Sequence, residues 1–416
     1  MEGKSNEDGD VPVWARPDAF PLKPDSAEKS EGSERFGFID PKGVRHAAES
    51  AEAFVEKVGK SRSRVNLVWT PDNDRLVVPE QIALLHKPLR ARQAKHAAQD
   101  GSDGIRMSLV FGSIMLWTLY AAWNNSGGKI ESLYTHQLSG LAAMLLFMFG
   151  LLPFYEGWKV QRRLSQTKAS DLAEEIPDAQ FDTWLHRQKI PVTYYLLGCL
   201  LVCGLVQVYL DWGKAQFNSS VIQAGLLKQA ALQHPGQLDA GAWWRMLTAP
   251  MLHGNAIHFL MNAGGILYLG RRTETLARWP HLLIVFVAAA WVGGLATFYW
   301  IPHKIAVGAS GGLLGLLGFM LVFETLHRGL VPKPARRRLL AGVLLMVVIG
   351  FIGMSFIDNA AHAGGLLAGM AYAAIVFPSS ISLRRPQTMG RDKIVGIFAG
   401  LIIFSAMVIT CVKVLS

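Results

Sequence analysis

Three short segments of this 416-residue chain place strongly polar side chains inside apolar sequence. They are HGNAIHFLMN, with His253, His258 and Asn262; GASG, with Ser310; and NAAHAGG, with His362. A serine hydroxyl becomes a nucleophile when a neighbouring base takes its proton, and histidine is the usual base near neutral pH. His258 and Asn262 are four residues apart, so on a helix they share one face and can donate to the same oxyanion. Together the segments predict a site at which Ser310 attacks a carbonyl carbon.

The serine segment also has two other interpretations. GASGG fits the small-xxx-small pattern of packed membrane helices, through Gly308 with Gly312 and Gly311 with Gly315. It fits the G-x-S-x-G elbow of α/β-hydrolases as well, but that motif needs a preceding strand and a soluble βα repeat, which this sequence does not supply. Helix packing therefore remains the main alternative to nucleophilic chemistry at Ser310.

The histidines have alternatives of their own. His362 can be a hydrogen-bonded packing residue, His258 with Asn262 can cap contacts between helices, and His253 can lie at the membrane interface. Zinc binding by the three histidines is disfavoured, because no H-E-x-x-H spacing and no accompanying carboxylate are present. The sequence predicts neither a metal nor a cofactor.

The elements that must position these side chains have membrane length. The chain is 51% hydrophobic and 17% charged, and its apolar residues concentrate after Met107, which predicts a polytopic membrane protein with a soluble N-terminal region. A helix needs about 20 apolar residues to cross the hydrocarbon core. Nine runs approach that length: 107–123, 137–155, 191–211, 254–270, 281–300, 308–326, 338–355, 358–377 and 393–413. Cys199, Cys203 and Cys411 fall within these runs and are interpreted as packing residues.

The net charge of +10 is explained by orientation rather than by nucleic-acid binding. Lys and Arg crowd alternate connectors, such as HKPLRARQAKH and HRGLVPKPARRR, and this positive-inside pattern predicts a cytoplasmic N-terminus and an extracytoplasmic C-terminus. The spans that carry Asn262, Ser310 and His362 then all enter from outside, which puts these side chains in one layer about 5–15 Å below the outer surface. A shared water-filled site explains such a layer better than coincidence does.

The region before the first span is expected to be partly folded. Residues 1–34 are rich in Pro, Ser, Glu and Lys, which predicts disorder. Residues 35–105 predict a small cytoplasmic α+β domain, with RFGFID, RVNLVWT and RLVVP as strands and helical spacing in GVRHAAESAEAFVEKVG. Farther along, residues 212–252 are expected to lie along the membrane interface.

The order WWR, HGNAIHFLMN, GASG and NAAHAGG resembles the rhomboid family of intramembrane serine proteases. The resemblance covers about residues 190–378 and implies a rhomboid-like core of six transmembrane helices. Residues 106–189 then hold two added spans and a basic linker, and residues 379–416 hold a linker and one added C-terminal span. The expected fold is an all-α polytopic membrane protein with this core, the three added helices and the small α+β N-terminal domain.

The resemblance also implies roles for single residues. Ser310 would be the nucleophile and His362 the general base of a dyad, while His258, Asn262 and the backbone N–H of Ser310 would form the oxyanion hole. Supporting roles are implied for His253, Gly308, Gly311, Trp244, Arg245 and Gly365.

Two positions depart from the family pattern, and one nearby acid stays outside the predicted site. Leu314 stands where many members carry an aromatic residue, and Ala360 stands where a glycine is frequent. Asp358 is one helical turn before His362 and is expected to start a helix in contact with solvent, rather than to complete a triad.

The expected activity is hydrolysis of peptide bonds in or next to transmembrane segments, with membrane-protein substrates and the lipid bilayer as partners and no nucleic acid. The alternative is a non-catalytic rhomboid-like protein that binds and escorts membrane clients, which would be expected to lose Ser310 or His362. A transporter is disfavoured, because its polar groups would lie near the bilayer centre. The N-terminus shows neither a signal peptide nor a transit peptide, so the expected location is a bacterial inner membrane, with the site near the extracytoplasmic face.

Overall fold

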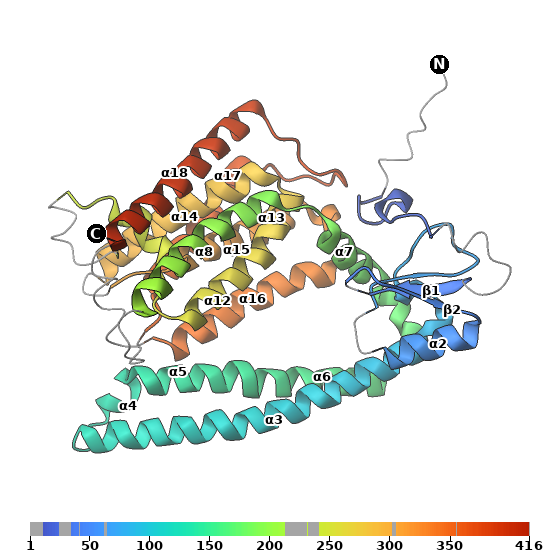
Figure 1. The fold of residues 1–416 in the computed structure, drawn as a ribbon, viewed down its shortest axis with the longest axis horizontal. Coiled ribbons are helices and arrows are strands. Elements are labelled where there is room, and N and C mark those ends of the chain that lie inside the picture. The colour runs from blue at the N-terminus through green and yellow to red at the C-terminus, as the bar shows by residue number, and fades with distance from the viewer. Residues whose placement is uncertain are drawn as a thin grey trace. The chain divides into compact units, whose positions relative to one another are not determined.

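The computed structural model describes residues 11–24, 35–40, 42–61, 65–212, 231, 241–301, 305–354 and 356–415. The interpretation of residues 212–252 as an interface segment falls mostly outside this described part. The described residues are mainly helical, with one small sheet near the N-terminus (Figure 1). They divide into two compact units, Met1–Trp184 with Val347–Ile357, and Leu185–Met346 with Asp358–Ser416.

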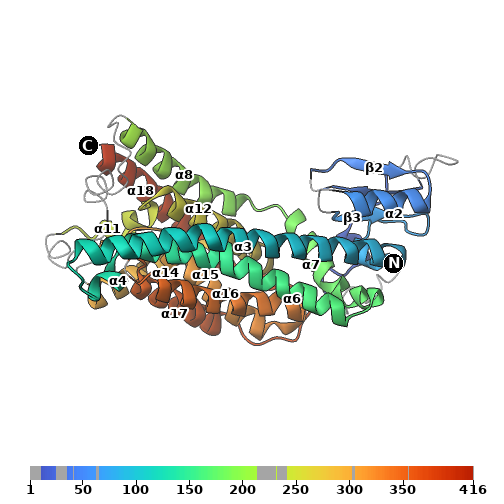
Figure 2. The ribbon, with the colours of Figure 1, turned by 90° about the horizontal axis from the view of Figure 1, so that it is seen from below.

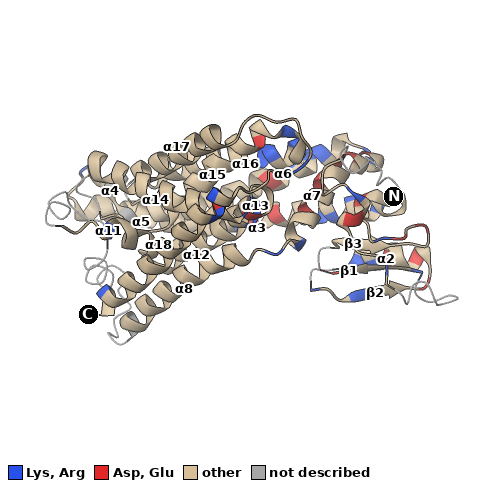
Figure 3. Ribbon diagram, turned by 90° about the horizontal axis from the view of Figure 1, so that it is seen from above, with Lys and Arg blue, Asp and Glu red and all other residues tan. Residues whose placement is uncertain are grey.

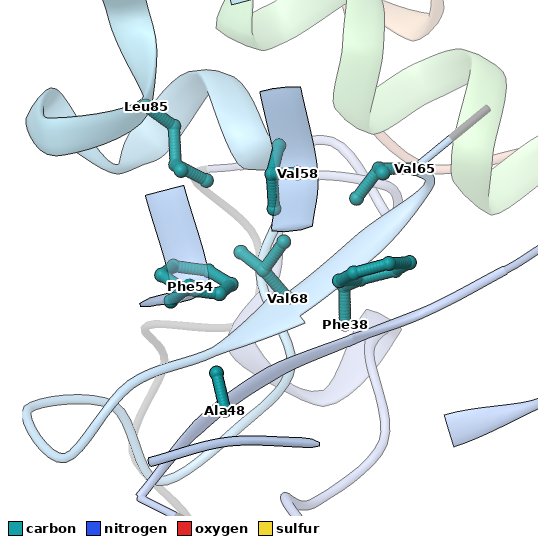
Figure 4. Close-up of a cluster of buried hydrophobic side chains, with 7 residues drawn as sticks. All are labelled: Phe38, Ala48, Phe54, Val58, Val65, Val68 and Leu85. Carbon is teal, nitrogen blue, oxygen red and sulfur yellow. The ribbon is translucent and has the colours of Figure 1, made fainter. Parts of the chain in front are cut away.

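The first unit begins with a small α+β domain. Its elements are β1 (Phe36–Ile39), β2 (Arg45–Ala48), α2 (Ala51–Lys60) and β3 (Leu67–Trp69), and the antiparallel sheet has the order β2-β1-β3. Helix α2 begins where the Ser50 hydroxyl accepts a hydrogen bond from the backbone N–H of Ala53, at 3.1 Å. Its Phe54 and Val58 are fully buried against Phe38 of the sheet, in the apolar cluster drawn in Figure 4.

The structure corrects three details of this region. Residues 11–24 are ordered rather than disordered: Trp14 packs on the ring of Phe181 at 6.0 Å, and Leu22 forms a β-bridge with Arg75. Segment RLVVP contributes only isolated bridges instead of a strand. Residues Arg45–Ala48, expected to be helical, form β2 instead, and the helix starts only after the Ser50 cap. The buried aromatic side chains explain why the polar N-terminal segment orders.

The remaining elements of the first unit are helical, and the longest of them form a hairpin. Its elements are η2 (Pro17–Ala19), η3 (Pro79–Gln81), η4 (Ala83–Leu85), α3 (His86–Asn125), α4 (Glu131–Thr135), α5 (Gln137–Leu145), the π-helical η5 (Leu146–Leu151), α6 (Leu152–Gln166), η6 (Ala169–Glu175) and α7 (Ile176–Arg187), which ends just inside the second unit.

Helices α3 and α6 run side by side (Figure 2). They can approach closely because Gly104 has no Cβ; a Cβ there would lie 2.6 Å from the backbone nitrogen of Phe154. The expected domain boundary after residue 105 falls inside α3, since LRARQAKHAAQD is rich in helix-forming residues and continues the membrane helix into the soluble region.

The second unit is a helical bundle. Its helices are α8 (Pro191–Trp212), α11 (Arg245–Thr248), α12 (Ala256–Gly265), α13 (Arg271–Leu276), α14 (Trp279–Trp300), α15 (Ser310–Leu326), α16 (Lys333–Ile352, whose end belongs to the first unit), α17 (Asn359–Val376) and α18 (Gly390–Leu415), with short turns η7 (Ala249–Met251), η8 (Ile266–Gly270) and η9 (Arg328–Leu330).

Six helices of the described chain are long and apolar enough to cross a membrane: Ala83–Asn125, Leu138–Gln166, Pro191–Leu210, Trp279–Trp300, Asn359–Val376 and Gly390–Leu415. The other three expected spans also form helices. One is α12, which continues through η8 into α13; the second is α15, and the third is α16. Helix α15 has only 17 residues, and α16 begins with a basic run, so these spans remain predictions. The fold confirms the expected class, a mostly helical polytopic membrane protein with a small N-terminal sheet.

Charged side chains of the second unit gather at α13 and the start of α16 (Figure 3). There Arg272 and Glu324, at most 1% exposed, form a two-pronged ion pair with N–O distances of 2.5 and 2.8 Å. Glu274 accepts hydrogen bonds from the backbone N–H groups of Val192 and Thr193 at the first turn of α8, at 3.1 and 2.7 Å. These contacts tie α8, α13 and α15 together at the end of the bundle opposite to Ser310.

Candidate active site

Ser310 is the first residue of α15 and lines a cavity of about 40 Å³ in the second unit. That volume exceeds the ~10–15 Å³ that one water molecule requires. Gly308, Asp358 and Ala361 line the same cavity. The backbone N–H groups in the first turn of a helix have no acceptor within the helix, so the start of α15 supplies donors beside the Ser310 hydroxyl.

Gly308 brings the serine segment against the side chains of α12. Its φ is +112°, which favours glycine, and its N–H donates to the carbonyl oxygen of Ala249 at 2.9 Å. A Cβ on Gly308 would lie 2.6 Å from Cε1 of His258 and 3.4 Å from Nδ2 of Asn262. The structure therefore places both predicted oxyanion donors next to the backbone two residues before Ser310.

Asn262 is 5% exposed, and its Nδ2 has no hydrogen-bond partner among the described residues. An unpaired buried donor costs about 1–3 kcal/mol, which suits a group that donates to a reaction intermediate. We expect Asn262→Ala to lower kcat by at least about 10-fold with little change in KM, because the lost bond forms in the transition state. Steady-state kinetics with a membrane reporter substrate measures this. An unchanged kcat would remove Asn262 from the oxyanion hole.

His253 supports His258 rather than facing the cavity. The His253 ring lies edge-on to the His258 ring, with 5.3 Å between their centroids, and edge-on to Phe259 at 5.1 Å. Its backbone exchanges two hydrogen bonds with the side-chain amide of Gln207 from α8, both of 3.1 Å. Gln207 is not among the residues predicted from the sequence, although an amide inside an apolar span is a signal for such a role.

His362 lies on the row of α17 that borders α15. Leu366 and Met370 follow it at i+4 and i+8, and both contact the position where Gly318 of α15 would carry a Cβ. Closer to the N-terminal ends of the two helices, Gly365 of α17 packs against the backbone of Gly311 of α15. Since the two helices run in the same direction with this register, His362 stands at the level of Ser310.

The backbones of α15 and α17 touch because glycines face each other. A Cβ on Gly365 would overlap with the carbonyl oxygen of Gly311, and a Cβ on Gly369 would overlap with that of Gly315. On a third side, a Cβ on Gly312 would lie 2.7 Å from the Phe286 ring of α14. The packing interpretation of GASGG thus accounts for Gly312 and Gly315, while Gly308, Ser310 and Gly311 line the cavity and Gly311 also packs against α17.

Asp358 caps the start of α17, as expected; it is partly exposed and is among the residues that line the cavity. Its Oδ1 accepts from the N–H of Ala361 at 3.0 Å, and its Oδ2 accepts from the hydroxyl of Thr297 at 2.7 Å. Both oxygens are thereby occupied in fixing the first turn of α17 against α14. The expected helix start at Asp358 is confirmed, and these two hydrogen bonds make Asp358 a residue that positions the His362 turn.

The remaining predicted residues surround this site. Trp244 directly precedes α11, and the Arg245 guanidinium lies 4.8 Å from its ring. Leu314 and Ala360, the two departures from the family pattern, are 7% and 6% exposed. No group of three or more His, Cys, Asp or Glu side chains able to hold a metal ion occurs among the described residues.

Comparison with known proteins identifies the domain that carries this geometry. Residues 240–379 match the family model described as the Rhomboid domain. RHOMBOID-like protein 6, mitochondrial, from Arabidopsis thaliana is 32% identical over 164 residues, which cover 39% of this chain and 51% of that protein. Rhomboid protease GluP from Bacillus subtilis is 31% identical over 191 residues, which cover 46% of this chain and 36% of GluP.

The relatives differ in stated activity. Inactive rhomboid protein 2 from Homo sapiens is 30% identical over 138 residues, which cover 33% of this chain and 16% of that protein. The chain thus spans about half the length of the first plant relative and about a third of GluP. The matches agree on the domain, and they include both a protease and an inactive protein.

Proposed function

This chain belongs to the rhomboid family and is an integral membrane protein, and from that premise we propose that it is an intramembrane serine endopeptidase. The observation that carries the proposal is that His258 and Asn262 of α12 lie beside Gly308, two residues before Ser310. Ser310 begins α15, and α15 packs in register with α17, which carries His362. A site built only for helix packing has no use for an unpaired buried amide donor or for a cavity at a helix start.

In the proposed reaction the Ser310 hydroxyl attacks the carbonyl carbon of a peptide bond while the His362 imidazole accepts its proton. The negative charge on the former carbonyl oxygen is stabilised by His258, Asn262 and the backbone N–H of Ser310. Breaking the C–N bond releases the amine, which takes the proton back from His362, and leaves an acyl group on Ser310. Water then hydrolyses this ester with His362 as the base, and no cofactor is required.

The substrate class follows from the location of the site. A peptide bond inside a membrane helix is hydrogen-bonded and shielded, so the substrate must unwind locally before its carbonyl can reach Ser310. We therefore propose membrane proteins whose transmembrane segments contain small or helix-destabilising residues. From the distribution of Lys and Arg, the N-terminal domain lies on the cytoplasmic side and Ser310 near the opposite face. The relatives come from a plant and from a bacterium, so they do not identify the cellular membrane in which this protein lies.

The proposal is tested with purified protein in liposomes and two reporter substrates that differ in one segment. One reporter carries a Gly- and Ser-containing transmembrane helix, and the other carries leucines at the same positions. We expect cleavage of the first and little or none of the second, measured by gel mobility, with the cut site located by sequencing the new N-terminus. Stable binding of the first reporter without any cleavage would favour a client-binding protein instead.

A further inference from the structure

The added C-terminal helix α18 ends against the segments that frame the Ser310 cavity. Val414, in its last turn, is 4% exposed and belongs to an apolar cluster with Leu252. Trp244 and Val307 pack against the same cluster. Val307 also lines the cavity and precedes Gly308. One cluster therefore joins the end of α18 to the loop that leads into the nucleophile.

A second contact runs from the same turn of α18 to the tryptophan before α11. The Lys413 ammonium lies 5.3 Å from the centre of the Trp244 ring. Lys413 is exposed, and a cation over an aromatic face is attracted by the ring quadrupole at exposed sites too. From Trp244 the chain continues through α11 into η7, where the carbonyl oxygen of Ala249 accepts the 2.9 Å hydrogen bond of the Gly308 N–H. Lys413 and Gly308 are thus connected through one short stretch of chain.

Helix α18 is itself firmly supported. A Cβ on Gly396 would lie 2.8 Å from Cα of Pro280, so the backbones of α18 and α14 are in contact. The Tyr195 hydroxyl of α8 donates to the carbonyl oxygen of Gly400 at 2.7 Å. Farther along the same interface, the thiols of Cys203 and Cys411 lie 4.0 Å apart. The packing of α18 against α8 and α14 therefore holds its last turn in place beside the cluster.

We propose that α18 positions the active site: Val414 and Lys413 hold Val307 and Trp244, and thereby set the Gly308–Ser310 backbone relative to His258 and Asn262. The proposal rests on the proposed function for its kinetic consequence only. Val414 and Lys413 are positioning residues, since they reach the reacting atoms through Val307, Trp244 and the Ala249–Gly308 hydrogen bond. A misplacement of about 1 Å arising far from the chemistry can cost up to ~100-fold in rate.

The chain offers a matched control for Val414. Val412 lies two residues earlier on α18 and is 58% exposed, so Val414→Ala and Val412→Ala remove the same atoms from opposite environments. Below the melting temperature of both variants, we expect Val414→Ala to slow fluorophosphonate labelling of Ser310 by about 3- to 10-fold and to lower kcat rather than raise KM. Val412→Ala should match the wild type. Equal labelling rates for the two variants would overturn the proposal.

Lys413 allows an independent test, in which a conservative substitution should restore the effect of the residue. Lys413→Met keeps the length of the side chain but removes the cation, and should slow labelling, whereas Lys413→Arg keeps the cation–π contact and should restore the rate. Lys393→Met, at the other end of α18, is the charge-matched control. A rate for Lys413→Met equal to that for Lys393→Met would contradict the role of Lys413.

Amide hydrogen exchange separates failure of this inference from failure of the protease proposal. Peptides that cover residues 305–312 should exchange faster in Val414→Ala than in Val412→Ala, whether or not the protein hydrolyses anything. If the wild type did not label but this difference appeared, the protease proposal would fall and the positioning role of α18 would stand. If exchange were equal in the two variants, the positioning role would be refuted.

Discussion

Ser310→Ala should lower the turnover of a cleavable membrane substrate by at least about 1,000-fold, because the hydroxyl oxygen forms the covalent bond to the substrate and no neighbouring group replaces it. His362→Ala should cause a loss of the same size, since Ser310 is a poor nucleophile without a base. Residues that act as one unit give non-additive losses, so the double variant should be no slower than either single variant. Initial rates with a purified reporter in liposomes measure all three.

The controls for this prediction remove the same atoms elsewhere. Ser113→Ala and His96→Ala change residues of α3 in the first unit and should retain wild-type turnover. Each inactive variant should also melt near the wild-type temperature, because Ser310 lines a cavity and His362 is only partly buried. Substantial cleavage by folded Ser310→Ala would show that another group is the nucleophile.

Gly369→Val should prevent the second unit from folding correctly. A Cβ at this position would overlap with the backbone carbonyl oxygen of Gly315, and a backbone atom cannot move aside as a flexible side chain can. Overpacking of this kind typically costs about 1–3 kcal/mol and more when backbones must separate. We expect the upper end of that range or beyond, together with loss of activity, because separating α17 from α15 also separates His362 from Ser310.

Gly198→Val provides the comparison, since Gly198 lies within the membrane helix α8 and a Cβ there has no neighbouring atom within 4 Å. Thermal melting in one detergent, together with the yield of monodisperse protein, reports the difference. If Gly369→Val melted at the same temperature as Gly198→Val, the tight register between α15 and α17 would be refuted.

The amino-acid sequence predicts much of this architecture because apolar length and charge placement act locally. Each expected span matches a helix or a short series of helical segments to within about three residues at each end, allowing for longer helices, and the polar segments lie where α12, α15 and α17 begin. The sheet order β2-β1-β3 and the late start of α2 depend on pairing and capping, which periodicity does not reveal. The same limit explains why Trp14, buried against Phe181, was placed in a disordered segment.

The candidate site shows which properties need three dimensions. Ser310, Asn262 and His258 are recognisable because polar groups are rare in apolar spans. Gln207 and Thr297 were missed because their importance comes from partners distant in sequence, the backbone of His253 and the carboxylate of Asp358. In GASGG, Gly311 and Gly315 pack helices as the packing interpretation predicts, while Gly308 leaves space for the ring of His258. The packing role of Gly311 and Gly315 becomes distinguishable from the role of Gly308 only when the register between α15 and α17 is known.

The proposed mechanism requires a reactive hydroxyl at the start of α15 and a base on α17. The direct measurement is peptide mass spectrometry of the purified protein after treatment with a fluorophosphonate. One phosphonyl adduct on Ser310 is predicted in the wild type, with its formation slowed at least about 100-fold in His362→Ala because the base is lost. An unmodified Ser310 in folded wild-type protein, or an adduct that forms at the same rate without His362, would contradict the account.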